Sequence, residues 1–225
     1  MFLLIATAVA FSPAVLATEC GSIPRTEPEF RRLEAPPLPG VDAAVERAKL
    51  AYFLGRYTAD ADLRAEMFSR ALQEIEVWRS SHPKHPGVLL WWAGLQGEAS
   101  LARGKLAALG KIGAIESALL ELAAADPAYD HHGADRALGS LYHEAPTLIS
   151  IGSYSRARDR FAAAMAAAPA YPANRLYYAK FLSENGERGK AVELAESVLA
   201  SLSSGEFPVE ACLWRRMATE IVGRP

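Results

Sequence analysis

The chain of 225 residues contains only two cysteines, and only 9% of its residues are aromatic. Two cysteines cannot supply the dense disulfide framework that stabilises many small secreted domains. The low aromatic content, together with abundant alanine, disfavours a β-sandwich and favours helices that pack closely through small side chains. Stability must therefore come from a helical hydrophobic core, for which the chain is long enough.

An excess of positive charge is also missing. The chain has 24 basic and 26 acidic residues, which gives a formal net charge of -2. Arginines dominate the basic residues, but they are scattered along the chain and interleaved with acidic residues. A nucleic-acid-binding protein needs a basic patch or stripe. We therefore expect no nucleic-acid partner and assign the charges to a solvated surface.

Common catalytic signatures are absent. The segments "LGSLY" and "IGSYS" lack the second glycine of a nucleophile elbow, and "GKLAALGK" lacks the Ser or Thr of a phosphate-binding loop. "HEAPT" begins at His143 like a metalloprotease helix, but Thr147 stands where the second histidine is required and Pro146 would disrupt the helix. We predict that the protein is not an enzyme and uses no cofactor.

The segment "YDHHGAD" raises the question of a metal site. His131 lies one helical turn from Asp135, and His132 lies one turn from Arg136. Zinc needs three or four ligands at suitable spacing, and neither pair provides them. We predict no metal site, and expect Asp130 to cap a helix whose His132 faces water.

The N-terminus is apolar and ends in small residues. Residues 1–17 are predicted to be a cleaved signal peptide, which implies export to the periplasm. Cys20 follows, but Glu19 occupies a position where a lipid-attachment site requires Gly, Ala or Ser, so we do not expect lipid anchoring at Cys20. In an oxidising compartment Cys20 and Cys212 can form a disulfide, or both can remain free thiols. Both alternatives stay open.

The rest of the chain divides into two parts. Residues 18–40 are rich in proline and show no helical period, so we predict an extended N-terminal arm. Residues 41–225 show helix after helix without period-two alternation, and form the predicted helical-repeat domain. The helices expected here include residues 42–57, 87–103, 131–144, 173–185 and 208–222. Asp42 is expected to cap the first helix, and the last is expected to direct Trp214 and Met217 inward and Arg215, Arg216 and Glu220 outward.

One spacing recurs along the chain: a residue, the fourth after it, the third after that, and a proline five further on. It appears in four sets, Ala71–Ile75–Trp78–Pro83, Ile115–Leu119–Leu122–Pro127, Ala157–Phe161–Ala164–Pro169 and Ala191–Ala195–Val198, the last with Ser203 in place of proline. Positions four and three apart share one helix face, and the proline ends the helix. The pattern indicates a repeated helix that buries a stripe of small and large apolar residues.

Helix pairs of this kind resemble the tetratricopeptide repeat, whose unit is 34 residues. Ala157 and Ala191 are separated by 34 residues, whereas the two earlier intervals are longer. The resemblance implies an all-α, tetratricopeptide-like solenoid of about four helix pairs with a C-terminal capping helix. The extra residues fall in two apolar connections, 104–113 and 145–152, which we expect to pack over one end of a groove or to form an oligomer contact.

A more specific resemblance lies in "GADRALGSLYHEAP", which begins at Gly133 and is followed by an "IGSY" turn. With the exported N-terminus, this segment resembles the T component of tripartite ATP-independent periplasmic (TRAP) transporters, the TatT-like family. The match is best over residues 126–200. Members of that family are exported, divergent tetratricopeptide solenoids that partner a periplasmic solute-binding protein. They assemble as homo-oligomers with a pore through each subunit, and are commonly lipoproteins.

The candidate binding residues are an arginine and five aromatic residues: Trp91, Trp92, Arg136, Tyr142, Tyr177 and Tyr178. Trp91 and Trp92 point about 100° apart on a helix, so one is expected in the core and the other in the concave groove. Arg136 either forms a structural ion pair with Asp126 or Glu116, or contacts a ligand or partner. Because asparagine and lysine are scarce, a clamp for a peptide's terminal carboxylate is not expected, and an apolar or mixed surface fits better.

The sequence thus predicts an exported, non-catalytic scaffold. The expected partner is a periplasmic solute-binding protein of a TRAP-type transport system, with a small apolar ligand inside the curve of the solenoid. The alternative is a generic tetratricopeptide adaptor in cell-envelope assembly or secretion.

Overall fold

The computed structural model describes residues 28–35, 39–202 and 209–223, and the regular structure within these ranges is entirely helical. The all-α prediction is confirmed. The helices are α2 (Pro28–Glu34), α3 (Val41–Tyr57), α4 (Ala61–Ser81), α5 (Pro86–Ala102), α6 (Lys105–Leu109), α7 (Ile112–Ala125), α8 (Tyr129–Glu144), α9 (Tyr154–Ala167), α10 (Pro172–Glu184), α11 (Arg188–Ser201) and α12 (Ala211–Gly223).

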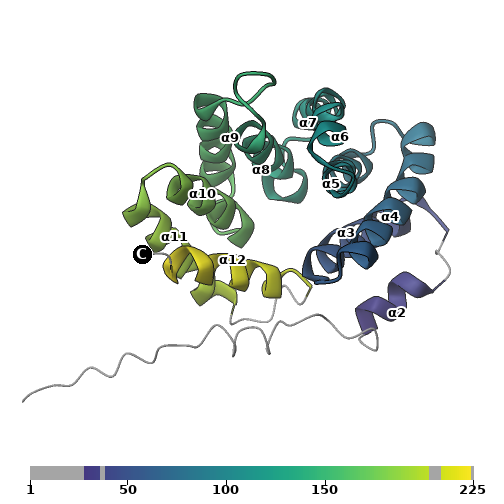
Figure 1. The fold of residues 1–225 in the computed structure, drawn as a ribbon, viewed down its shortest axis with the longest axis horizontal. Coiled ribbons are helices and arrows are strands. Elements are labelled where there is room, and N and C mark those ends of the chain that lie inside the picture. The colour runs from purple at the N-terminus through teal and green to yellow at the C-terminus, as the bar shows by residue number, and fades with distance from the viewer. Residues whose placement is uncertain (1–27, 36–38, 203–208, 224–225) are drawn as a thin grey trace, which may run out of the picture.

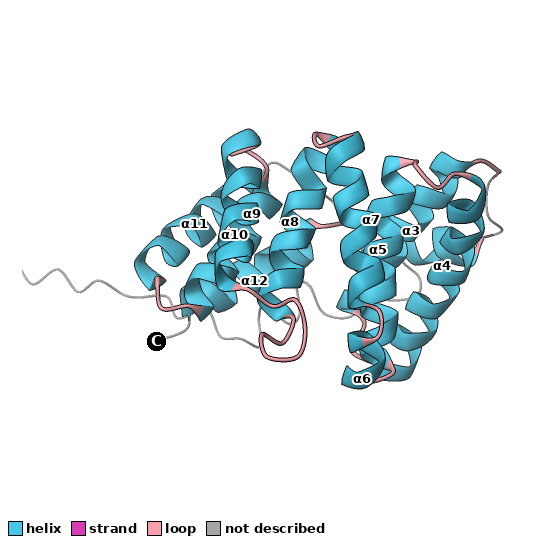
Figure 2. Cartoon of the chain, turned by 90° about the horizontal axis from the view of Figure 1, so that it is seen from above, coloured by secondary structure: helices cyan, strands magenta, loops and turns pink. Residues whose placement is uncertain are grey.

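The helices pack as successive pairs. α3 pairs with α4, α5 with α7, α8 with α9, and α10 with α11, while the short α6 is inserted in the second pair and α12 follows the fourth. This is the predicted arrangement of four helix pairs and a terminal helix. The pairs curve into a ring, with α3, α5, α8, α10 and α12 toward its middle and α4, α7, α9 and α11 outside (Figure 1). Viewed from above, the paired helices stand side by side in a row (Figure 2).

The recurring spacing marks the buried face of each outer helix. The first positions of the four sets are all buried, with exposed fractions of 9%, 6%, 0% and 0% for Ala71, Ile115, Ala157 and Ala191. The second positions are buried as well: Ile75, Leu119, Phe161 and Ala195. Four equivalent stripes therefore pack against their partner helices, as the repeat requires.

Two glycines allow the paired helices to approach closely. A Cβ atom at Gly139 of α8 would lie 2.8 Å from Cδ1 and Cε1 of Phe161 on α9. A Cβ atom at Gly55 of α3 would overlap the ring of Phe68 on α4 in the same way. Both phenylalanine rings are buried. A small residue on the inner helix thus accommodates a large one on the outer helix.

α12 closes the ring by packing against α3. Trp214 is 1% exposed, and its ring meets Phe53 of α3 in an edge-to-face contact with centroids 6.4 Å apart. The backbone N–H of Leu213 donates to the hydroxyl of Tyr57 at 2.9 Å. Arg216 and Glu220 are exposed and Arg215 is half-buried, so the predicted orientation of this helix is borne out in outline. The solenoid therefore joins its first pair to its last helix.

The predicted arm is not extended throughout, because residues 28–34 form α2. The guanidinium of Arg47 on α3 donates to the carbonyls of Arg32, Leu33 and Ala35, at 2.8, 3.0 and 3.1 Å. These carbonyls end a helix and have no partner within it, so a distant arginine stabilises the helix end. Arg47 lies 12 to 15 residues beyond the carbonyls that it binds, so the contact leaves no local pattern in the sequence. The sequence prediction therefore missed this helix.

Two predicted helix starts also differ. α3 begins at Val41 after Gly40, whose φ of 108° favours glycine, so Asp42 lies in the first turn and is not the N-cap. α12 begins at Ala211 after a turn at 209–210, not at 208. Local pattern places a helix well but its ends poorly.

Several predictions lie outside the described residues. These are the signal peptide at 1–17, lipid attachment at Cys20, residues 18–27 of the arm, and position 203 of the fourth repeat set. Cys212 is disulfide-bonded in the structure. None of the helices in the described ranges is both long and apolar enough to cross a membrane.

Candidate functional site: a cavity inside the ring

The ring of helices encloses a cavity of about 670 Å³. Its wall takes residues from all four helix pairs and from α12, so the cavity exists only because the ring closes. Ligand pockets in proteins commonly measure about 300–1,000 Å³. The volume is therefore suited to a small organic molecule.

One side of the cavity is an aromatic cluster drawn from three helices and the turn before α10. Tyr52 contacts Trp91 with ring centroids 5.7 Å apart, and Tyr171 contacts Trp214 at 5.6 Å. Phe53 lies between Trp91 and Trp214, at 5.9 and 6.4 Å. Edge-to-face contacts of this kind are the preferred geometry of aromatic pairs. The cluster stabilises the ring and gives the cavity an apolar wall.

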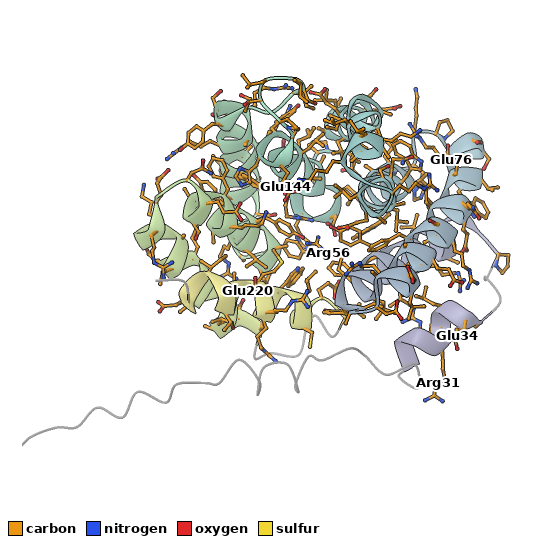
Figure 3. All side chains as sticks on the ribbon, viewed as in Figure 1. Arg31, Glu34, Arg56, Glu76, Glu144 and Glu220 are labelled. Atoms are coloured by element: carbon orange, nitrogen blue, oxygen red, sulfur yellow. The ribbon has the colours of Figure 1, made fainter. Side chains whose placement is uncertain are left out.

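Arg56 brings charge into this apolar space. It extends from α3 into the middle of the ring (Figure 3). Its Nη1 donates to the hydroxyls of Tyr52 at 2.5 Å and Tyr177 at 3.2 Å, and its Nε lies 3.5 Å from Oε1 of Glu98. Burial raises the pKa of Tyr52 well above its ordinary value, so this hydroxyl keeps its proton at neutral pH. Burial also raises the pKa of Glu98, although Arg56 opposes this shift.

Ion pairs occupy other positions on the wall. Lys49 binds Glu210 at 2.7 Å, and Lys180 of α10 binds Glu144 of α8 at 2.9 Å. The first pair joins α3 to the turn before α12, and the second joins α10 to α8. These pairs neutralise the two lysines Lys49 and Lys180 of the wall.

The start of α8 is strained. Asp130, His131 and His132 have φ values of 49°, 53° and 63°, in the left-handed region that residues other than glycine seldom adopt. Arg136 pairs with Asp130 and donates to Oδ1 of Asn174 at 2.7 Å. The side-chain amide of Asn174 in turn donates to the carbonyl of His131 at 3.0 Å. Arg136 and Asn174 therefore hold the strained segment in place.

This geometry settles the partner of Arg136. The ion pair is made with Asp130 on its own helix, and not with the predicted Asp126 or Glu116. Three left-handed residues fold Asp130 back toward Arg136, which a regular helix would not do. For the same reason Asp130 does not act as the predicted N-cap of α8, whose N-cap is Ala128.

Three of the six predicted site residues line the cavity: Trp91, Arg136 and Tyr177. The other three are structural contacts elsewhere. Trp92 is buried against α4, with the guanidinium of Arg79 3.4 Å from its ring and its indole N–H donating to Glu76, which Figure 3 labels on α4. The two tryptophans therefore divide between groove and core as predicted.

Tyr142 and Tyr178 also lie away from the cavity wall. Tyr142 is 1% exposed and donates to Glu116 at 2.9 Å. Tyr178 stacks on Phe161 with centroids 6.1 Å apart. Both tyrosines therefore hold inner helices against outer ones.

The sequence prediction overlooked Tyr52, Arg56, Glu98 and Trp214 as cavity residues. Arg56 carried a weak signal, because it is a charged residue four positions after Tyr52 within an otherwise apolar stretch of α3. Glu98 on α5 carried none. Its proximity to Arg56 depends on the way two helix pairs stack.

The described part of the chain contains no group of three or more His, Cys, Asp or Glu residues placed to hold a metal ion. His132 lies 3.4 Å from Asp135, and Asp135 pairs with Arg160 at 2.7 Å. The histidine-rich segment is thus tied to its neighbours by ordinary polar contacts.

Comparison with known proteins supports the fold. No protein-family model and no curated protein sequence matches the chain. A solved structure, that of a thermophilic tetratricopeptide-repeat protein from Thermus thermophilus, is similar with a TM-score of 0.55 and 15% sequence identity. The similarity covers 81% of this chain and 90% of that chain. The protein is therefore an all-α, tetratricopeptide-like solenoid whose curve closes into a ring.

Proposed function

We propose that this protein is a non-catalytic binding scaffold, exported to the periplasm, that holds a small apolar ligand in the ring cavity and partners a solute-binding protein of a TRAP-type transport system. The observation that supports a binding function is the cavity itself, which is about 670 Å³ in volume and walled by every helix pair. A ring that closes around a cavity of this size has fewer core contacts than a filled core, and a ligand bound there supplies such contacts.

The polar groups of the wall favour binding over catalysis. Ser140 is the one serine among the described residues that line the cavity. Its hydroxyl donates to the carbonyl of Arg136 at 3.2 Å. No histidine or cysteine stands beside it among the lining residues. A nucleophile needs a base within hydrogen-bond reach. The described wall offers charged pairs and aromatic rings instead.

The proposed partner rests on the resemblance of residues 126–200 to the TatT-like family. In that segment Arg136 holds the strained start of α8, and Gly139 admits the ring of Phe161. Two residues of the motif "GADRALGSLYHEAP", Arg136 and Gly139, therefore have structural roles in this chain. Membership of the family, export and assembly as a homo-oligomer are parts of the same proposal.

The alternative, a generic tetratricopeptide adaptor, is favoured by the two apolar connections. Leu109 of α6 and Ile149 of the loop after α8 line the cavity, while their neighbours Leu106 and Leu148 are 85% and 96% exposed. Exposed apolar patches often mark contact surfaces for proteins. These connections lie at the cavity, as predicted for residues that pack over a groove end.

The test combines ligand detection with partner capture. The mature chain is purified from native periplasm, and bound molecules are measured by native mass spectrometry. Gly97→Leu is the matched cavity-filling variant, because a Cβ at Gly97 meets only Ile115, at 3.9 Å. Gly113→Leu is its control, since a Cβ there meets no atom within 4 Å. We expect a bound small molecule whose occupancy falls in the first variant and not in the second.

Equal occupancy in both variants, or none in the wild type, would contradict a ligand-binding cavity. Affinity capture on the same samples addresses the partner. Enrichment of a TRAP-type solute-binding protein supports the proposal, whereas enrichment of secretion or cell-wall assembly proteins supports the adaptor alternative.

A further inference from the structure

We infer that Arg56, Tyr52 and Tyr177 form a carboxylate-binding site inside the cavity, and that the ligand is a small organic monocarboxylate with an apolar body. This inference rests on the proposed function, because it names the chemistry of the ligand that the cavity holds.

Arg56 has more hydrogen-bond donors than the described part of the protein uses. A guanidinium has five N–H donors. In Arg56, Nη1 uses its donors on the two tyrosine hydroxyls, and Nη2 has no acceptor among the described residues. The hydroxyls of Tyr52 and Tyr177 accept from Arg56 and donate to no described residue. Two N–H groups and two O–H groups of this cluster thus have no acceptor among the described residues.

An acceptor with two oxygens matches this arrangement. One carboxylate oxygen can receive the N–H groups of Nη2, and the other can receive the tyrosine hydroxyls. Hydrogen bonds between a guanidinium and a carboxylate are among the strongest that a protein makes, and more so away from water. The donors are set on two inner helices, α3 and α10, so the site is preorganised.

Glu98 limits the charge of the ligand. Its carboxyl lies 3.5 Å from Nε of Arg56 and makes no hydrogen bond within the described part of the chain. Arg56 is therefore opposed by one acidic group, and a phosphate dianion would bring one more uncompensated negative charge into the cavity than a monocarboxylate does. Burial raises the pKa of Glu98 above its ordinary value, and the neighbouring Arg56 opposes that shift.

The other half-buried cations of the wall are already engaged. Lys49 and Lys180 form ion pairs at 2.7 and 2.9 Å, and Arg136 is held by Asp130 and Asn174. Lys105 is exposed to water. Among the described lining cations, Arg56 is thus the half-buried one that has both free donors and neighbouring hydroxyls.

The apolar body of the ligand follows from the rest of the wall. The aromatic cluster and Met217 lie on one side, and the apolar connections line another part of the wall. This site differs from the asparagine and lysine clamp that tetratricopeptide domains use for a peptide terminus. Here an arginine and two tyrosines lie inside a closed ring of limited volume.

The test compares ligands that differ only in the head group. The full mature chain, freed of co-purified ligand, is titrated with octanoate, octanol, octylamine and octyl phosphate by calorimetry. Fluorescence of Trp91 and Trp214, which line the cavity, is the second readout. We expect octanoate to bind about tenfold or more tightly than octanol, the factor that a charge-assisted hydrogen bond supplies.

Variants show whether the preference for octanoate over octanol depends on Arg56 and Tyr177. Arg56→Gln is expected to reduce octanoate binding to the level of octanol, and Tyr177→Phe to weaken octanoate alone. Arg158→Gln, which removes an ion pair with Glu187 on the outer helices, is the control and should bind as the wild type does. Circular dichroism checks that each variant is folded. If Arg56→Gln does not fold, Tyr177→Phe still tests the proposal.

Equal binding of octanoate and octanol overturns the carboxylate site and leaves the proposed ligand-binding function standing. Preference for octyl phosphate or octylamine, or a preference for octanoate that survives both variants, also overturns it. Failure of every probe to bind overturns it as well, while the native mass spectrum judges the proposed function separately.

Discussion

Replacing Gly139 by alanine tests the contact that makes α8 and α9 a repeat pair. The new Cβ would lie 2.8 Å from Cδ1 and Cε1, and 2.9 Å from Cγ, of Phe161. The ring is 2% exposed and cannot swing into solvent. Either the ring or the helix must move.

Two opposing effects set the magnitude. Overpacking a well-packed core costs about 1–3 kcal/mol. Replacing glycine by alanine within a helix stabilises it by about 1 kcal/mol. The expected net loss in the free energy of unfolding is about 1 kcal/mol. In a domain of this size, that loss lowers the melting temperature by about 2–4 °C.

The assay is thermal and denaturant unfolding followed by circular dichroism. Gly189→Ala in α11 is the matched control, since a Cβ there meets nothing within 4 Å. It should leave stability unchanged or raise it. Adding Phe161→Leu to Gly139→Ala should relieve the overlap, so the double variant loses less than the sum of the two single losses. A stabilised Gly139→Ala variant, with additive losses in the double variant, would refute the predicted contact.

Three further predictions concern the ring and the cavity. Trp214→Ala should lower the free energy of unfolding by about 3–5 kcal/mol in denaturant melts, because it removes the buried contact between α12 and α3. Asn174→Ala should lower it by about 1–3 kcal/mol, because the carbonyl of His131 loses its partner and the strained segment is released. Burial raises the pKa of Glu98 in the folded chain, so protonation favours the folded state, and stability from this group increases as pH falls through the raised pKa. Glu98→Gln should abolish that part of the pH dependence of the melting temperature.

Exposed positions provide the controls. Val77→Ala on the outside of α4 and Asn185→Ala at the end of α10 should each change stability by less than about 0.5–1 kcal/mol. Glu196→Gln on the surface of α11 should leave the pH profile as it is in the wild type. If Trp214→Ala loses no more stability than Val77→Ala, or Asn174→Ala no more than Asn185→Ala, the corresponding contact is contradicted. If Glu98→Gln leaves the pH dependence of the melting temperature unchanged, the burial of Glu98 is contradicted.

Much of the fold was predictable because the spacing of apolar residues is a local property. The sets beginning at Ala71, Ile115, Ala157 and Ala191 each lie within one helix, and a helix brings positions four and three apart onto one face. The number of helix pairs and the terminal helix followed from them. Helix α2 was not predictable in this way, because its last carbonyls are satisfied by Arg47 from another helix.

The candidate site was predicted only in part. Trp91, Arg136 and Tyr177 were selected as aromatic or charged residues on inner helices, and they line the cavity. Tyr142 and Tyr178 met the same criterion, yet Tyr142 packs between inner and outer helices and Tyr178 stacks on Phe161 of an outer helix. Composition identifies a residue type that suits a binding surface, but the side of the helix it occupies depends on its neighbours.

The amino-acid sequence by itself determined the helices of the repeat domain, their pairing and the buried stripe of each outer helix, because these follow from periodicity and side-chain volume. Tertiary structure alone decided that the solenoid closes, through Phe53 and Trp214, which are far apart in the chain. Closure brings Tyr177 of α10 to Arg56 of α3, whereas Glu98 reaches Arg56 because α5 stacks on α3. The physical reason is that closure depends on the summed curvature of all the pairs, a quantity that no single segment carries.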